Sequence, residues 1–227
     1  MTAEYHDLRE ELQTGDLVLW SGKGKFSAII KAGTFCKWSH VGIIVNLKAY
    51  NFVTMWESTT GGCTYDLESG VIRNGVQLVP LSARVQEYSG DIAIRKLYGP
   101  NKQRDWFHED QLQSLWKLRK DLRNKPYYNP DGDNPGDLED STWKQKLELF
   151  KAVYDGIWGD NKEDLSGVFC SELVAEAYKC LGLLPQEIPS NEYTPADFSS
   201  SKERLKLLSG YSLGEEIPVE YDETRQL

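Results

Sequence analysis

The sequence predicts one α+β domain built on an antiparallel sheet, and three observations lead to this prediction. The chain has 227 residues, which is the size of one domain or of one domain with an insertion. About five short segments that are apolar, or that alternate between apolar and polar residues, occur before residue 100, mostly with short connections. Beyond Pro100 the apolar residues recur at helical spacing instead.

Alternation and turn residues define the expected strands, which are residues 16–20, 39–47, 51–58, 75–81 and 91–97. In the second of these, Val41, Ile43 and Val45 fall on one face of the strand. His40 falls on the opposite face, together with Ile44. We expect the second and third strands to pair as a hairpin, because only a short turn separates them.

Helical spacing and helix-ending residues predict four helices, over 26–32, over 103–122, over 142–154, and from Cys170 to just before Gly182. We therefore divide the chain into an N-terminal segment (1–14), a single domain (15–205) and an acidic C-terminal tail (206–227). The end of this tail, from residue 215, is rich in acidic residues, and we expect it to be frayed.

Composition and charge exclude several classes of protein. The 35 acidic residues outnumber the 26 basic ones and give a net charge of −9, so we expect no binding to nucleic acid, which needs clustered Lys and Arg. No apolar run is long enough for a transmembrane segment, and the charged N-terminus does not resemble a secretory signal. We expect a cytoplasmic protein in a reducing compartment, with specialised export, release by lysis or a viral origin left open.

The four cysteines, Cys36, Cys63, Cys170 and Cys180, are expected to be free thiols in such a compartment. Their spacing does not form the pairs that are typical of zinc sites, so we expect neither a metal nor another cofactor. Cys170 is the thiol best placed for chemistry, because the positive end of a helix dipole at its predicted position favours a thiolate. The alternative for Cys170 is a small buried core residue.

A nucleophilic thiol needs a base, which is most often histidine, and the chain has three histidines. His6 lies in a polar terminus and His108 among acidic residues, whereas His40 opens a predicted buried strand. Glu57 lies on the next strand, where it can accept a hydrogen bond from one imidazole nitrogen and leave the other nitrogen for a thiol. Each of these residues alone also fits a purely structural role, and only their combination indicates a catalytic site.

These residues resemble the circularly permuted branch of the NlpC-like papain superfamily, which includes YiiX-like bacterial proteins and poxvirus relatives. The matching segments are GDLVLW, SHVGIIV, MWES, PYY and FCSELVAEAY, from about residue 15 to about 184. The histidine strand precedes the cysteine helix, which is the permuted order. The resemblance implies a papain-like fold, with a strongly bent antiparallel sheet or partial barrel of five to six strands and packed helices. It also implies a cap-like insertion at about 129–165.

By the same resemblance, Cys170 is the nucleophile, His40 the base and Glu57 the residue that orients the histidine. Tyr127 matches a tyrosine whose side chain lies near the thiol, with Tyr128 as its alternative. We also expect Ser39 and Ser171, the neighbours of the histidine and the cysteine, to bind substrate or to help hold an oxyanion.

The expected activity is that of a cysteine hydrolase, which cleaves an amide or ester bond through an acyl-enzyme on Cys170. The expected partner is a small-molecule, peptide or lipid substrate, and the oligomeric state stays open. The alternatives are an acyltransferase acting on a lipid or amino-acid acyl group, a non-catalytic lipid- or peptide-binding protein, and a structural protein that uses its exposed aromatic residues.

Overall fold

The fold is described from a computed structural model, over residues 2–60, 63–104, 107–126, 169–202, 205–222 and 224. The side chains of Lys25, Phe26 and Ile29 are not part of this description. Tyr127, Tyr128, the expected helix over 142–154 and the expected cap at 129–165 also lie outside the described residues.

The central element is a sheet of seven strands, in the order β1-β9-β6-β2-β3-β4-β5. Neighbouring strands are antiparallel except β1 and β9, which are parallel, so the sheet is mixed. The α+β class is confirmed, but the sheet has more strands than the five to six expected and is not purely antiparallel. The strands are β1 (Ala3–Glu4), β2 (Leu17–Ser21), β3 (His40–Leu47), β4 (Phe52–Thr59), β5 (Gly75–Pro80), β6 (Asp91–Arg95) and β9 (Ile217–Glu220). A separate pair is formed by β7 (Leu97–Tyr98) and β8 (Ser212–Leu213).

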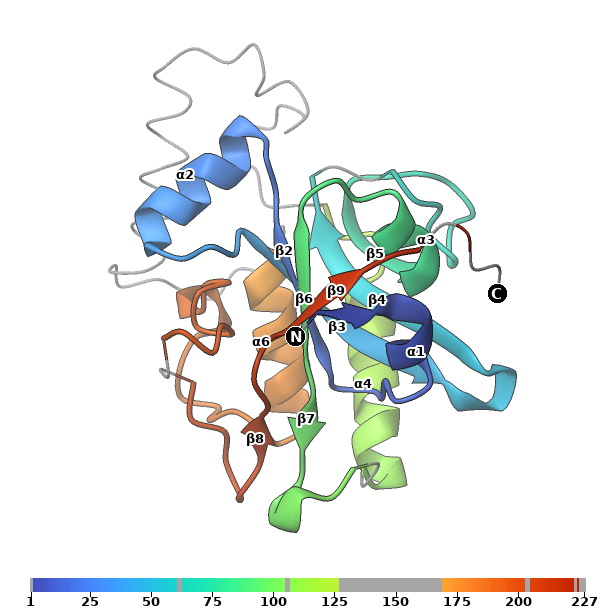
Figure 1. The fold of residues 1–227 in the computed structure, drawn as a ribbon. Coiled ribbons are helices and arrows are strands. Elements are labelled where there is room, and N and C mark those ends of the chain that lie inside the picture. Colours follow the sequence, from blue (N-terminus) through green and yellow to red (C-terminus); the bar gives the residue numbers. More distant parts are fainter. Residues whose placement is uncertain are drawn as a thin grey trace.

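The two additional strands come from the ends of the chain. In β9, Val219 pairs with Ile92 of β6 and with Ala3 of β1, and its side chain is buried. The expectation of a frayed tail is therefore wrong for Ile217–Glu220, because this short segment completes the ladder beside β6 and covers apolar side chains. Figure 1 shows the N-terminal strand beside β9.

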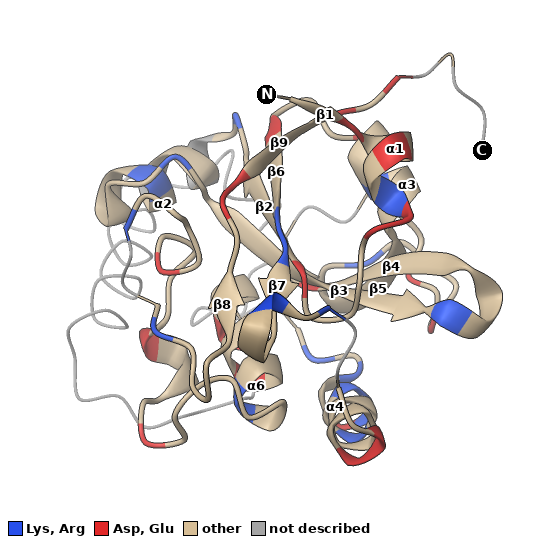
Figure 2. Cartoon of the chain, turned by 60° about the horizontal axis from the view of Figure 1, so that its bottom comes forward, with Lys and Arg blue, Asp and Glu red and all other residues tan. Residues whose placement is uncertain are grey.

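Both faces of the sheet are covered, as the alternation in β3 predicts. Val41, Ile43 and Val45 pack in a core with helices α4 (Glu109–Leu122) and α6 (Cys170–Cys180). Ile44 packs on the other side, in a core that includes residues of α1 (Tyr5–Arg9) and α3 (Leu81–Gln86). In Figure 2, α4 and α6 lie below the sheet and α1 and α3 lie above it.

The remaining helices are α2 (Lys25–Thr34) and three short 3-10 turns, Lys48–Tyr50, Pro100–Lys102 and Ser190–Glu192. The helix expected from residue 103 begins instead at Glu109. Gln103 itself has an extended backbone (φ −68°, ψ 153°), so the chain is not helical at this residue. His108 is the residue before this helix, and its backbone N–H donates to the Gln111 side chain, so it serves as a helix cap. Within the described part of the chain, no helix combines the length and the apolar character that crossing a membrane requires.

One buried hydrogen bond fixes α6 relative to the start of the sheet. Tyr178 is fully buried, and its hydroxyl donates to the carbonyl oxygen of Gly15 over 2.7 Å. Gly15 lies two residues before β2, and its backbone N–H donates to the carbonyl oxygen of Ile44 in β3. The bond therefore joins the helix that carries Cys170 to the strands that flank His40.

We expect Tyr178→Phe to lower the free energy of unfolding by about 1–3 kcal/mol, because the Gly15 carbonyl would lose a buried donor. Urea unfolding followed by circular dichroism measures this change. Tyr50→Phe is the matched control, since Tyr50 is 81% exposed, and we expect a change within about 0.5 kcal/mol. Equal effects of the two substitutions would contradict the role given to this bond.

Candidate active site

His40 is held where the start of β3 lies beside the end of β2. His40 begins β3 and pairs with Trp20 of β2. The neighbouring Ser39 is buried, and its hydroxyl accepts a hydrogen bond from the Gly22 N–H (3.1 Å) and donates to the Trp20 carbonyl (3.4 Å). The structure thus places the Ser39 hydroxyl in backbone contacts that hold the start of β3 against the end of β2.

Glu57 and His40 are brought together by the pairing of β3 with β4. Ile43 pairs with Trp56, so Glu57 lies diagonally across from His40 on the same face of the sheet. The Nε2 atom of His40 and the Oε2 atom of Glu57 are 2.5 Å apart. Because this contact uses Nε2, the Nδ1 atom is the ring nitrogen left for another partner.

Cys170 approaches the imidazole from the start of a helix. It is the first residue of α6, and the helix packs against β3 and β4. The preceding residue, Phe169, donates its backbone N–H to the Glu172 side chain over 3.0 Å, which fixes the start of the helix. Cys170 is among the groups whose charge acts on His40, so its thiol lies near the imidazole that Glu57 contacts. Only 3% of Cys170 is exposed, so the thiol sits in a largely desolvated position.

The charges around His40 favour its protonated form. Burial lowers the pKa of His40, but the negative charge of Cys170, its hydrogen bond and the Glu57 carboxylate outweigh burial. Together they raise the pKa of His40 to about 9. His40 is therefore largely an imidazolium at neutral pH.

Glu57 is fully buried and yet held in its ionised form. Burial would raise the pKa of its carboxyl, but the charge of Arg84 and the hydrogen bonds from His40 and Gln77 lower it to about 2. Gln77 Nε2 donates to Oε1 over 2.9 Å, and Arg84 Nε donates to the same oxygen over 3.0 Å. These two partners were not predicted from the sequence. Gln77 lies directly opposite Glu57 in the pairing of β4 with β5, so extending the expected strand register would have found it.

The sequence also predicts roles for Ser171 and Tyr127, and it leaves the other cysteines as weaker candidates. Ser171 is the second residue of α6 and is buried. Tyr127 lies outside the described residues, so its expected place near the thiol stays a prediction. All four cysteines are free, as expected, and Cys63 is the exposed one. Burial and then the charge of Glu176 raise the pKa of Cys180, which makes it a poorer nucleophile.

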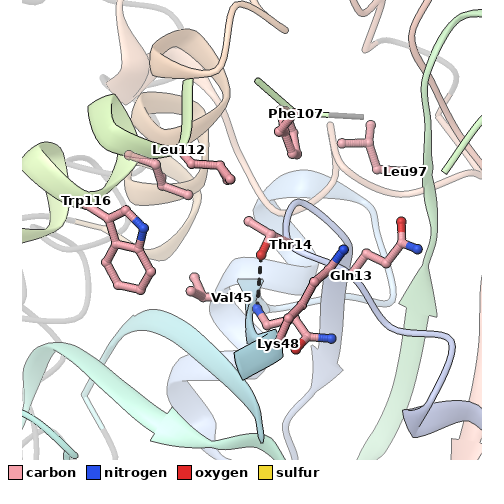
Figure 3. Close-up of a pocket in the computed structure, with 10 residues that line it drawn as sticks. Gln13, Thr14, Val45, Lys48, Leu97, Phe107, Leu112 and Trp116 are labelled. Carbon is pink, nitrogen blue, oxygen red and sulfur yellow. Dashed lines mark hydrogen bonds between the residues drawn. The ribbon is translucent and has the colours of Figure 1, made fainter. Parts of the chain in front are cut away.

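A cavity of about 190 Å³ lies elsewhere in the protein (Figure 3). Its apolar wall includes Leu112 and Trp116 of α4, and its polar side includes Gln13 and Lys48. Val45, which also lines it, is five residues along β3 from His40, or roughly 16 Å at the rise of a strand. The cavity is therefore not part of the Cys170 site.

Metal ions in proteins are held mainly by His, Cys, Asp and Glu side chains. Among the described residues, no group of three or more His, Cys, Asp and Glu side chains is arranged to hold a metal ion.

The chain is distantly similar to solved structures. No family model matches the chain, and no curated protein matches it. The chain is similar to the crystal structure of the metalloprotein YiiX from Escherichia coli O157:H7 (DUF1105) at 14% sequence identity and a TM-score of 0.48. The alignment covers 92% of this chain and 98% of YiiX. YiiX is one of the proteins that the sequence resemblance named, but a similarity this distant carries no argument about activity, and the permuted papain-like fold stays a prediction.

We expect Glu57→Gln to lower the midpoint of the His40 titration from about 9 by about 1–3 pH units, because one of the negative charges that stabilise the imidazolium is removed. NMR of the histidine ring protons measures the midpoint, and the signals of His6 and His108 serve as internal references. Glu11→Gln is the matched control, because Glu11 is exposed and pairs with Lys96. An unchanged His40 midpoint in Glu57→Gln would show that Glu57 does not support the charge on the ring.

Proposed function

We propose that the protein is a cysteine hydrolase that cleaves an amide or ester bond through an acyl-enzyme on Cys170. The observation that carries the proposal is the surroundings of the His40 imidazole: Glu57 contacts its Nε2 atom, and the Cys170 thiol at the start of α6 lies near enough to act on the charge of the ring. A nucleophile, a base within hydrogen-bond reach and a group that orients the base are the parts that acyl transfer requires.

The first half of the reaction forms the acyl-enzyme. The Cys170 thiolate attacks the substrate carbonyl carbon, a C–S bond forms and the carbonyl oxygen becomes an oxyanion. The backbone N–H of Cys170 lies at the beginning of α6, where the helix dipole favours negative charge, and it helps to hold this oxyanion. His40 donates its proton to the leaving nitrogen or oxygen as the C–N or C–O bond breaks.

The second half releases the acyl group. Neutral His40 takes a proton from a water molecule, the water oxygen bonds to the acyl carbon, and the C–S bond breaks to regenerate the thiolate. His40 keeps this proton, and the product is a carboxylic acid. If an alcohol or an amine replaces the water, the same steps make an acyltransferase, so the acceptor decides between the two activities. Because all four cysteines are free, we also propose that the protein works in a reducing compartment.

The test is the rate of iodoacetamide labelling at each cysteine, measured by peptide mass spectrometry from pH 4 to 9. We expect Cys170 to label at pH 5–6, because an adjacent imidazolium holds the thiol as a thiolate there. His40→Ala should remove this low-pH labelling. A small reagent is used because Cys170 is largely buried.

The other three cysteines are the internal controls. Burial raises the pKa of both Cys63 and Cys180, so we expect these thiols to label only at high pH. If Cys170 labels like them and is indifferent to His40, the hydrolase proposal fails. If Cys170 labels at pH 5–6 and this labelling depends on His40, a panel of amides and esters is assayed next. Cys170→Ala must then abolish the turnover of any substrate found.

A further inference from the structure

Arg84 is a buried cation that the mechanism above does not use. It lies on α3, is 6% exposed, and has the rings of Trp20 and Tyr88 over its guanidinium at 4.9 and 5.5 Å. Removing a charge from water is costly unless a counter-charge and hydrogen bonds replace the water. A buried guanidinium in this position therefore depends on its partners.

The partners of Arg84 connect it to the candidate active site. Its Nε atom donates to Oε1 of Glu57, while the other carboxylate oxygen, Oε2, binds His40. A separate nitrogen, Nη1, lies 3.7 Å from the Cys63 sulfur. Glu57 is thus held between two cations, and the charges alternate from Arg84 through Glu57 and His40 to Cys170.

We propose that Arg84 is a positioning residue of the hydrolase site, which keeps Glu57 ionised in acid and so sets the lowest pH at which His40 and Cys170 form an ion pair. This inference rests on the proposed function, since it concerns the working range of the same pair. It assigns the Cys170, His40 and Glu57 site a fourth member.

Among the described residues that contact Glu57, Arg84 is the one whose positive charge does not depend on Glu57. Gln77 donates a hydrogen bond but carries no charge, and His40 is the group whose charge depends on Glu57. Around Arg84, the nearby titratable groups are Cys63 and Tyr88, both of which are neutral at pH 5. Glu87 lies beyond Cys63 and accepts a hydrogen bond from Thr64 over 2.8 Å. The charge of Arg84 is accordingly the foremost cause that lowers the pKa of Glu57.

The side-chain chemistry also explains why an arginine occupies this position. A guanidinium is planar, so it can lie against the aromatic rings and direct different nitrogens to Glu57 and to Cys63 in one orientation. It also stays charged throughout the pH range in which Glu57 and His40 titrate. A neutral side chain at residue 84 would leave a buried carboxylate with His40 as its one charged partner among these groups, and the carboxylate would then take up a proton at higher pH.

The experiment compares Arg84→Gln, which removes the charge and keeps a donor, with Arg84→Lys, which keeps the charge. The readout is the ratio of the iodoacetamide labelling rates of Cys170 at pH 5 and pH 7.5. We expect Arg84→Gln to lower this ratio about tenfold, because without the charge of Arg84 the Glu57 carboxylate would take up a proton between about pH 4 and 6 and still be ionised at pH 7.5. Arg84→Lys should stay within about threefold of the wild type. Cys63→Ser is the matched control and should leave the ratio unchanged, because Cys63 contacts a different nitrogen of Arg84.

A second readout is independent of alkylation. In Arg84→Gln, the His40 ring signal in NMR should gain a titration step between about pH 4 and 6, as Glu57 takes up a proton. Failure of the proposed function would already be visible as slow Cys170 labelling in the wild type, whereas this step would still test the effect of Arg84 on Glu57. An unchanged ratio and no added step in Arg84→Gln would overturn the proposal.

A double-variant comparison covers the case in which Arg84→Gln alone does not fold. Glu57→Gln and Glu57→Gln/Arg84→Gln both lack the buried carboxylate, so the second variant is not left with an unpaired charge. If Arg84 acts through Glu57, these two variants must show the same labelling ratio. A further severalfold fall on removing Arg84 in this background would overturn the proposal.

Discussion

The ionised, fully buried carboxylate of Glu57 is the constraint on which the arrangement of the site depends. A buried charge of this kind persists only where donors and counter-charges replace the water that it has lost. The sheet supplies two of these groups, since His40 and Gln77 come from the strands on either side of β4. The third, Arg84, comes from the helix that directly follows β5. A shift in strand register would remove these partners together, so fold and site are specified by the same pairing.

The two residues proposed to react stand at the beginnings of their elements. His40 is the first residue of β3 and Cys170 the first residue of α6. The rest of each element is buried, through Ile43 and Val45 in the strand and Leu173 and Val174 in the helix, and this packing fixes where the two ends meet. Rigid, apolar elements thus hold reactive groups that would otherwise need their own support. The bond from Tyr178 to Gly15 adds a polar link between the same parts of the chain.

The sequence allowed the strands before residue 100 and the Cys170 helix to be predicted because their apolar residues follow a single period. The same reasoning missed β9. This strand has four residues, which include Pro218 and Glu220, and it forms through its pairing with β6. Cys170, His40 and Glu57 could be proposed because so few histidines are available. Arg84 could not, since a six-residue helix shows no clear period and a guanidinium on it has no local sign of being buried.

The charges that would serve the chemistry also link folding to pH. The pKa of His40 is raised from 6.5 to about 9, so its contribution to stability is complete below about pH 6.5 and is lost as the pH rises through 9. The pKa of Glu57 is lowered from 4.5 to about 2, so its contribution is complete above about pH 4.5 and is lost as the pH falls through 2. Both groups therefore stabilise the fold fully only between about pH 4.5 and 6.5. At neutral pH and above, part of the stabilisation by His40 is lost, while the ring remains largely protonated up to its raised pKa.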